Sequence, residues 1–472
     1  MSTEIKNREF ISPLNSRNSI EFINQLSQEI GKRGGSISII IQNQSDSDKI
    51  QKQISDDLII NDHISHKPTQ NLNFLTNKYK IDSVRSFVFP QLVYDYEYLK
   101  PSGGRFLPNG PVEPNFEPYI QRLHRLLDFF DGLYDDGYRG IPIQNQGGEI
   151  NRRVLARVAE YHDVPSIRCS FSPLPGRTTI RSGEQMAFPE IESALSRDLS
   201  RADRKRAEEY RQTVVTDRPQ VGVDVSTSRP TSIISNILGK AQIVAKKRLD
   251  SLPSIARWAR RTIGKPVQAK VQQYYALDRE DTREYVSSSK FVFYSLQYYR
   301  ESRVTMRSPA FYDQAGLIKY LSRSVPHGTE LLVKDHPQQL GAMPFSDIRQ
   351  ISRYVPIAKP STPAHNLIEK AEAVVTLNNT VGHEAIVFGK PVVVLGSALY
   401  GDLESVVHLD DINDLDTTIA KVIEDGGLSN DDIRRYIDAL FEISEPMKWG
   451  DPAKPNVDEF IYAIDRHLSK ID

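Results

Sequence analysis

The chain has 472 residues, with 60 lysines and arginines against 61 aspartates and glutamates, so its formal net charge is −1. This balance excludes the strongly basic class of nucleic-acid-binding proteins, and we expect no nucleic-acid partner. The single cysteine, Cys169, excludes an intramolecular disulfide framework and a multi-cysteine zinc site. We find no signal-peptide pattern and no apolar run of ~20 residues. The expectation is a cytoplasmic protein, soluble or peripheral at the inner face of the membrane.

The N-terminal part of the chain has the pattern of an α/β domain. An apolar stripe over 18–33 predicts a helix that ends at two glycines, and the run from 36 to 42 predicts a buried strand. Further on, 139–145, 150–161 and 164–171 predict a strand, a helix and a strand around a glycine turn. One βαβ unit of this kind implies a parallel sheet.

A basic segment follows the first α/β region and a charged helix predicted at 191–213. Between residues 240 and 270 the chain has nine lysines and arginines, one acidic residue, Asp250, and an aromatic residue, Trp258. We interpret 216–285 as a helical insertion or linker between two lobes. Two alternatives stay open for 240–270: contact with an anionic membrane surface, or a linker with a solvated basic face.

A second α/β region begins near residue 286. Strands are predicted at 291–296, 330–334, 373–377 and 391–395, and they alternate with helices at 313–322, 345–352 and 381–388. This alternation is typical of a doubly wound domain, which binds ligands at the carboxyl ends of its strands. We therefore expect Rossmann-like lobes at 1–215 and 286–450 with a central crevice, and a C-terminal helix at 451–472.

Two motifs in the second lobe follow predicted strands. Lys334-Asp335-His336-Pro337 offers a lysine as a point charge for phosphate and a histidine as a donor near neutral pH. The alternative is a surface turn. The second motif, 376–385, contains Asn378, Asn379, Thr380, Gly382 and Glu384.

Asn378, Asn379 and Thr380 are candidate caps for the helix that starts near residue 380. The same geometry suits an anion, because free amides at a helix N-terminus bind phosphate. We expect Gly382 to permit close approach of a ligand and Glu384 to hold a ribose diol. Together the two motifs predict a nucleotide-phosphate site.

The first lobe offers weaker candidates. Gly147 and Gly148 precede Glu149, which opens a helix and is either a favourable first-turn carboxylate or a general base. Asp135-Asp136 is either a catalytic carboxylate pair or a solvated turn. Arg177 belongs to a group of arginines that face either an anionic acceptor or solvent. We expect no metal, because Asp46-Ser-Asp48 lies in a polar loop and His63 and His66 have no ligand cluster around them.

The second lobe, from about Phe291 to Tyr400, resembles the capsular polysaccharide biosynthesis family, which contains bacterial capsule Kdo (3-deoxy-manno-octulosonate) transferases. The segments that carry the resemblance are 295–297, 332–337, 378–385, 389–391 and 395–400, with weaker matches at 145–149 and 174–176. One position departs from the family pattern, which usually has serine where this chain has Asn379.

The resemblance implies a GT-B fold and a glycosyltransferase that transfers Kdo or a related acidic sugar from a CMP-activated donor to a glycan or lipid-linked acceptor. It implies no separate cofactor. His336 and the turn 378–380 would hold the nucleotide phosphate, Lys334 would neutralise the leaving CMP, and Glu384 would face the ribose. Gly147, Gly148 and Arg177 would lie on the acceptor side, with Glu149 and His336 as catalytic candidates. Alternatives are a CDP-polyol phosphotransferase of teichoic-acid type, a GT-B-shaped nucleotide-sugar epimerase, and a non-catalytic assembly factor.

Overall fold

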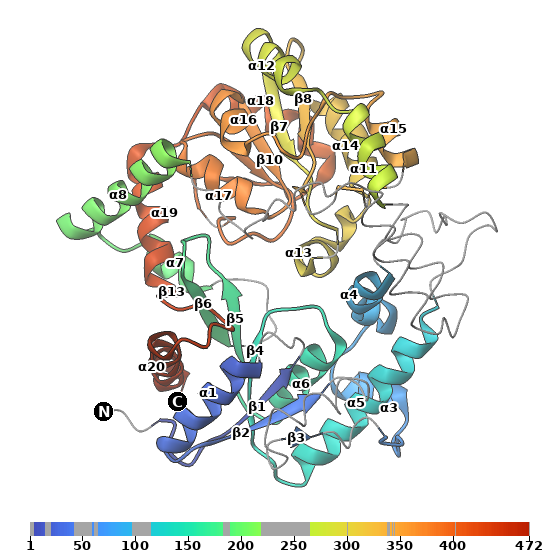
Figure 1. Ribbon diagram of the computed structural model, residues 1–472, viewed down its shortest axis with the longest axis vertical. Coiled ribbons are helices and arrows are strands. Elements are labelled where there is room, and N and C mark those ends of the chain that lie inside the picture. The colour runs from blue at the N-terminus through green and yellow to red at the C-terminus, as the bar shows by residue number, and fades with distance from the viewer. Residues whose placement is uncertain are drawn as a thin grey trace, which may run out of the picture. The chain divides into compact units, whose positions relative to one another are not determined.

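The computed structural model describes residues 4–14, 20–41, 59–60, 65–96, 115–182, 189–218, 265–299, 301–337, 340–341, 343, 345–401 and 403–471. The chain divides into two compact units, each with its own sheet (Figure 1). Unit 1 contains residues 1–95, 113–196 and 438–472, and unit 2 contains 96–112 and 197–437. The expected boundary at 215 therefore lies inside a helix of unit 2, and the C-terminal helix, expected as a separate part, belongs to unit 1.

Unit 1 is built on a mixed sheet in the order β3-β2-β1-β4-β5-β6-β13. Strands β1 to β5 are parallel, whereas β6 runs antiparallel to both β5 and β13. The expected βαβ unit is confirmed, because β4 and β5 pair in parallel on either side of α6 in the sequence. The strands are β1 (Glu9–Leu14), β2 (Ser36–Ile41), β3 (Ile59–Ile60), β4 (Ile141–Asn145), β5 (Ile167–Phe171), β6 (Thr178–Ser182) and β13 (Ser444–Glu445).

The helices of unit 1 bury apolar stripes. The first helix and the last pack together, with Phe22 and Phe460 edge-to-face at 5.4 Å between ring centroids. Because this contact joins the two ends of the sequence, the periodicity of neither helix predicts it. The helices are α1 (Ile20–Lys32), α3 (Leu72–Lys78), α4 (Val84–Tyr96), α5 (Glu117–Asp135), α6 (Ile150–Tyr161), α7 (Pro189–Leu195) and α20 (Lys454–Ile471).

Unit 2 is built on a sheet whose strands are all parallel, in the order β12-β11-β10-β7-β8-β9. If β7, the first of these strands in the chain, is numbered 1 and the sheet is followed from β9 to β12, the order is the doubly wound 3-2-1-4-5-6. The winding reverses between β7 and β10. The strands are β7 (Phe291–Ser295), β8 (Glu330–Lys334), β9 (Ile357–Ala358), β10 (Ala373–Thr376), β11 (Val392–Val394) and β12 (Val407–His408).

Alternating strand residues of unit 2 pack against helices on opposite faces of the sheet. One face joins Tyr294, Val333 and Val375 to the buried residues of α14, α15 and α18, while α16 and α17 contact each other and the sheet. The charged helix expected at 191–213 is two helices, α7 of unit 1 and α8 of unit 2. The helices and 3-10 turns are α8 (Arg201–Asp217), α11 (Lys265–Tyr274), α12 (Arg279–Ser288), α13 (Ser302–Thr305), η5 (Pro309–Phe311), α14 (Gln314–Ser324), α15 (Phe345–Ile351), α16 (Ala364–Lys370), α17 (Thr380–Val387), η7 (Ile412–Asp414), α18 (Leu415–Asp425) and α19 (Asn430–Glu442).

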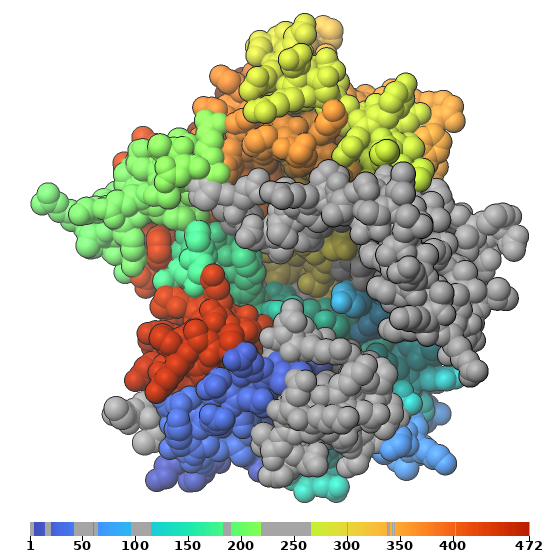
Figure 2. Space-filling view, in the orientation of Figure 1, coloured from blue at the N-terminus to red at the C-terminus, as the bar shows by residue number. Residues whose placement is uncertain are grey.

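Most of the basic segment at 240–270 lies outside the described residues, as do Asp46, Asp48 and His63. Its last residues begin α11, which lies with α8 and α12 at the surface of unit 2 in the view of Figure 2. Tyr274 at the end of α11 is 84% exposed. No helix in the described part of the chain is long and apolar enough to cross a membrane.

Candidate functional site

The candidate site of unit 2 lies where the winding of its sheet reverses. The segments that follow β7, β8 and β10 meet there, since β7 pairs with both other strands. Hydrogen bonds connect the three segments: the backbone N–H of Leu296 donates to the carbonyl of Lys334 at 2.9 Å, and the side-chain amide of Gln297 donates to Asn378 Oδ1 at 3.2 Å. The two predicted motifs are therefore neighbours in the fold, as expected for the carboxyl edge of a doubly wound sheet.

Lys334 is the last residue of β8 and is 5% exposed. Its Nζ donates to the carbonyl of Asp335 at 3.3 Å. Burial lowers the pKa of Lys334 to about 8, against the opposite influence of the carboxylates of Asp335 and Glu384. A buried ammonium of this kind retains most of its charge at pH 7 and gives it up in mild alkali.

His336 stands two residues beyond the strand, before Pro337, which begins a short turn. Its ring stacks on Tyr298, with 5.8 Å between centroids and 21° between planes, and its backbone N–H donates to Asp335 Oδ1 at 2.7 Å. Burial, with help from Lys334 and Arg303, lowers the pKa of His336 to about 4. The imidazole is therefore neutral near pH 7 and carries one ring N–H.

Asn378 and Asn379 are both held by hydrogen bonds within unit 2. The Asn378 amide donates to the carbonyl of Arg303 at 2.9 Å and to Ser308 Oγ at 3.0 Å. Asn379 is the N-cap of α17: its Oδ1 accepts from the N–H of Val381 at 3.0 Å, and its amide donates to the carbonyl of Ser295 at 3.1 Å. The capping alternative is confirmed for Asn379, whose side chain also ties this turn to β7.

The first turn of α17 is closed on one side by Tyr400. The Tyr400 hydroxyl donates to the carbonyl of Asn379 at 2.7 Å, and a Cβ added to Gly382 would overlap that hydroxyl and its ring. Gly382 was expected to make room for a ligand; in the structure it makes room for Tyr400. Thr380 is the half-buried residue of this turn, while 373–379 and 381–387 are buried. Thr380 is therefore the residue of 373–387 with the most exposed surface.

Glu384 lies one turn into α17 and is 5% exposed. Its Oε2 is 3.5 Å from Nε2 of His365, which comes from α16. The Glu384 carboxylate also lies near enough to Lys334 to raise the pKa of that lysine against the effect of its burial. The carboxylate thus has a histidine from one element and a lysine from another near it.

In unit 1, the turn at 147–149 also lies where the winding reverses, between β1 and β4. Glu149 is the N-cap residue of α6 but makes no side-chain capping bond. Its Oε2 instead pairs with Nη1 of Arg152 at 3.1 Å, and the side chain folds over Gly147, where a Cβ would overlap it. Gly148 is half-buried beside it. Gly147 therefore gives space to the Glu149–Arg152 ion pair within the turn.

Arg177 has partners inside unit 1. Its Nε donates to Ser444 Oγ at 2.9 Å, its Nη2 donates to the carbonyls of Phe441 and Ser444, and its guanidinium lies 5.3 Å from the Phe441 ring centroid. These contacts fasten the segment at β13 to the β5–β6 hairpin. They give Arg177 a structural role in unit 1, and its expected place on the acceptor side stays a prediction.

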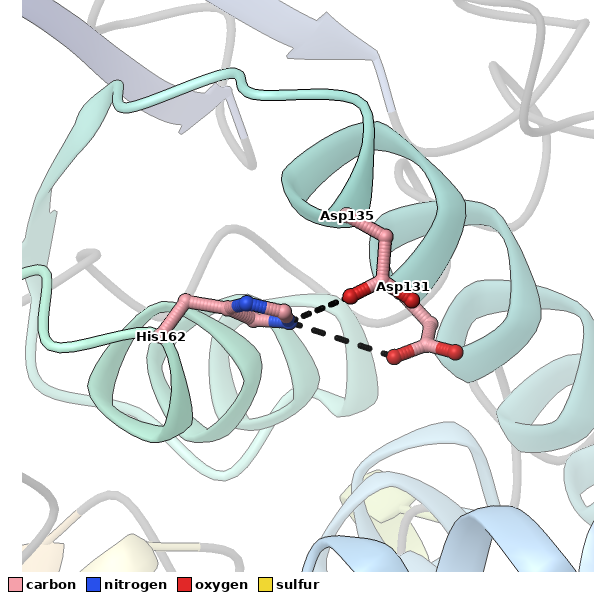
Figure 3. A group of neighbouring side chains, drawn as sticks. All are labelled: Asp131, Asp135 and His162. Carbon is pink, nitrogen blue, oxygen red and sulfur yellow. Dashed lines mark ion pairs between the residues drawn. The ribbon is translucent and has the colours of Figure 1, made fainter.

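One group in unit 1 has the residue types of a metal site (Figure 3). Nε2 of His162 lies 3.9 Å from Asp131 Oδ1 and 3.6 Å from Asp135 Oδ1. However, Nζ of Lys78 lies 2.5 Å from Asp131 and 3.4 Å from Asp135. The ammonium already offsets one of the two negative charges, and it would repel an added cation. Asp135, expected in a loop, is the last residue of α5, and these contacts explain it without catalysis.

Sequence reasoning missed several residues that shape the unit 2 site. His365 belongs to no motif, and only the packing of α16 against α17 brings it to Glu384. Tyr298 stacks on His336 from the segment after β7. The one available signal was position, since Tyr298 lies in the segment just beyond β7, at the carboxyl edge of the sheet.

Comparison with known proteins identifies the same region. Residues 244–404 match the family model described as "Capsule polysaccharide biosynthesis protein". Protein FixF of Sinorhizobium fredii is 28% identical over 156 residues, or 31% of this chain and 35% of that protein. The capsule polysaccharide export protein KpsS of Escherichia coli is 29% identical over 123 residues, 24% of this chain and 31% of KpsS. The chain thus matches about a third of the length of each curated relative.

Among solved structures, the chain is similar to KpsC of Thermosulfurimonas dismutans, described as a beta Kdo 2,7 transferase. The identity is 12%, the TM-score 0.41, and the alignment covers 71% of this chain and 89% of KpsC. This likeness assigns no activity. The family match, in contrast, spans the strands and motifs of unit 2 from which the resemblance was drawn. Residues 244–404 of the chain are thus similar to the capsule polysaccharide biosynthesis family.

Proposed function

We propose that the chain is a glycosyltransferase of capsular polysaccharide biosynthesis that transfers Kdo or a related acidic sugar from a CMP-activated donor. The observation that carries the proposal is the meeting of Lys334, His336 and the start of α17 at the reversal point of the unit 2 sheet. Nucleotides bind at this place in doubly wound sheets. The family match adds the biosynthetic context.

The phosphate of the donor is assigned to Lys334, His336 and Thr380. Lys334 supplies a buried positive charge, His336 a neutral ring N–H, and Thr380 a hydroxyl at the helix end. Such groups stabilise the charge that develops on a leaving nucleotide phosphate, because they are already in place and need no reorganisation. Pro337 and Asn378 support the two loops, and Glu384 is assigned to the ribose.

The acceptor is assigned to unit 1, where Gly147, Gly148 and Glu149 occupy its own reversal point. Glu149 is the proposed general base, and the acceptor is a glycan or a lipid-linked glycan. The ion pair between Glu149 and Arg152 orients the Glu149 carboxylate. This ion pair has to loosen before the carboxylate accepts a proton from the acceptor hydroxyl. We further propose peripheral membrane contact through 240–270, supported by its nine basic residues.

The test is transfer from CMP-Kdo to a capsule-linker acceptor by the wild-type chain and by His336→Ala, with circular dichroism as the control for folding. We expect His336→Ala to lose transfer while its helix content and melting temperature stay near those of the wild type. Full transfer by a folded His336→Ala chain would overturn the assignment. A thermal shift with UDP-sugars and none with CMP or CDP would point to the epimerase alternative.

Membrane contact is tested separately by flotation with vesicles of phosphatidylcholine alone and with added anionic phosphatidylglycerol. The full chain is compared with one in which the lysines and arginines of 240–261 are changed to glutamine. Flotation that depends on both the anionic lipid and the basic residues supports the proposal. Equal flotation of the two chains contradicts it.

A further inference from the structure

We propose that His365 is a positioning residue for Glu384, and that it orients this carboxylate toward the two hydroxyls of a ribose. The inference rests on the proposed function, because it concerns recognition of the nucleotide assigned to this site. Its new element is His365, which comes from α16, a helix without any of the motifs that identify the site.

The histidine and the glutamate are both enclosed. Their side chains are each 6% exposed, and the distance from His365 Nε2 to Glu384 Oε2 is 3.5 Å. The imidazole stacks on Phe388 at 5.4 Å between centroids with 27° between planes, which fixes the plane of the ring. Its edge is therefore directed at the carboxylate by a contact with α17's own C-cap residue.

The hydrogen bonds of this pair are incomplete in the ligand-free protein. Among the residues that the structure describes, buried His365 Nε2 has no hydrogen-bond partner, since 3.5 Å exceeds the usual length for a good N–H···O bond. Within the described part of the chain, the Glu384 carboxylate accepts no hydrogen bond from another side chain. A buried nitrogen without a partner is costly, which favours a state in which the two groups come closer.

A ribose diol supplies the hydrogen-bond donors that the Glu384 carboxylate lacks. A carboxylate only accepts hydrogen bonds and has about four lone-pair positions, so it can accept from two neighbouring hydroxyls and from one N–H as well. Lys334 supplies positive charge from β8, and the ring N–H of His365 would hold Oε2 from the other side. The carboxylate is then held between two elements and is less free to rotate away from the ligand.

The experiment measures discrimination between CMP and 2′-deoxy-CMP by isothermal titration calorimetry. Wild-type chain is expected to bind CMP roughly tenfold more tightly or better, as for a hydrogen bond to a charged group. His365→Asn carries its amide nearer the Nδ1 position and withdraws the nitrogen from Glu384. We expect it to reduce the preference to within about threefold, whereas His365→Gln, whose amide reaches the Nε2 position, restores it.

A matched control separates positioning from packing. Phe388→Leu removes the ring stack but leaves the nitrogen and the carboxylate in place, so it is expected to lower the melting temperature and keep the ribose preference. His365→Phe is the reverse change: it keeps an aromatic ring against Phe388 and loses the preference. A purely structural role for His365 would weaken CMP and 2′-deoxy-CMP equally and leave their ratio unchanged.

The outcomes also separate this inference from the proposed function. If wild-type chain binds neither CMP nor 2′-deoxy-CMP, the proposed function fails, and with it the basis for ribose recognition by Glu384. If it binds both equally, or if folded His365→Asn and His365→Phe chains keep the wild-type ratio, the inference about His365 is overturned while the nucleotide assignment stands.

Discussion

The hydroxyl of Tyr210 lies 3.0 Å from Nε2 of His383, on the side of α17 that faces α8. The other ring nitrogen of His383 lies 2.9 Å from the Tyr436 hydroxyl. The imidazole is fully buried, and burial, with a smaller contribution from His365, lowers its pKa to about 3. The helix that carries Thr380 and Glu384 is thus fastened to α8 and α19 through one neutral histidine.

Acid is expected to destabilise unit 2 through His383. Its pKa is about 3 in the folded chain and ordinarily 6.5, so between these values the unfolded chain binds more protons and stability falls as pH falls. At pH 4.5 the loss from this one group is about 2–3 kcal/mol. Urea unfolding at pH 7 and pH 4.5 measures it. His383→Gln should show a smaller loss over the same interval, and an equal loss would remove His383 as the cause.

Alkali is expected to weaken nucleotide binding through Lys334. The pKa of this lysine is about 8, so its positive charge is mostly present at pH 7 and mostly absent at pH 9. CMP affinity should therefore fall by roughly tenfold over that interval. Lys334→Met should bind CMP weakly at pH 7 with little further change at pH 9. Affinity of the wild type that is equal at both pH values would contradict the placement of the phosphate beside Lys334.

A methyl group at position 382 is expected to disrupt the first turn of α17. Gly382→Ala would displace Tyr400 and break its 2.7 Å hydrogen bond to the Asn379 carbonyl. The cost is about 1–3 kcal/mol, as for other overpacked interiors. Gly132→Ala is the control, because a Cβ there, in the last turn of α5, meets nothing within 4 Å and should be neutral or stabilising. Chemical denaturation measures the free energy of unfolding of both variants. A Gly382→Ala chain as stable as the wild type would contradict the packing role of Gly382.

The departure from the family pattern at position 379 is expected to leave nucleotide binding intact. Asn379→Ser keeps an N-cap oxygen but loses the amide that donates to Ser295, so stability should fall by about 1 kcal/mol. Asn379→Ala loses both and should cost more. Both variants should retain CMP binding in calorimetry, measured below their melting temperatures. Loss of binding in the serine variant, with its fold retained, would show that the amide contacts the ligand.

Much of unit 2 was predictable from the sequence because its strands are short, continuous apolar runs and its helices have clear stripes. The limits of β8 agree with the prediction, and those of α17 differ from it by one residue at each end. In unit 1 the central strand β1 was missed. It contains Ser12 and Pro13, which weaken a strand pattern, and it gains its stability from β2 and β4 on either side.

The site was predictable only in part, for a related reason. Lys334, His336 and Asn379 were proposed because they lie at or just beyond the ends of strands, and strand ends are visible in the sequence. The contact of Gly382 with Tyr400 was not foreseen, because Tyr400 is 18 residues further along the chain. His365 was missed because its partner is supplied by helix packing, which no local pattern reveals.

The central claim is that the reversal point of the unit 2 sheet binds a cytidine nucleotide. Isothermal titration of the chain with CMP, and with UMP as the matched pyrimidine, tests it most directly, with Thr380→Ala and His336→Ala as site variants. We expect the wild type to bind CMP more tightly than UMP, and both folded variants to bind CMP at least tenfold more weakly. CMP binding that is absent from the folded wild type, or unchanged in both variants, would contradict the account.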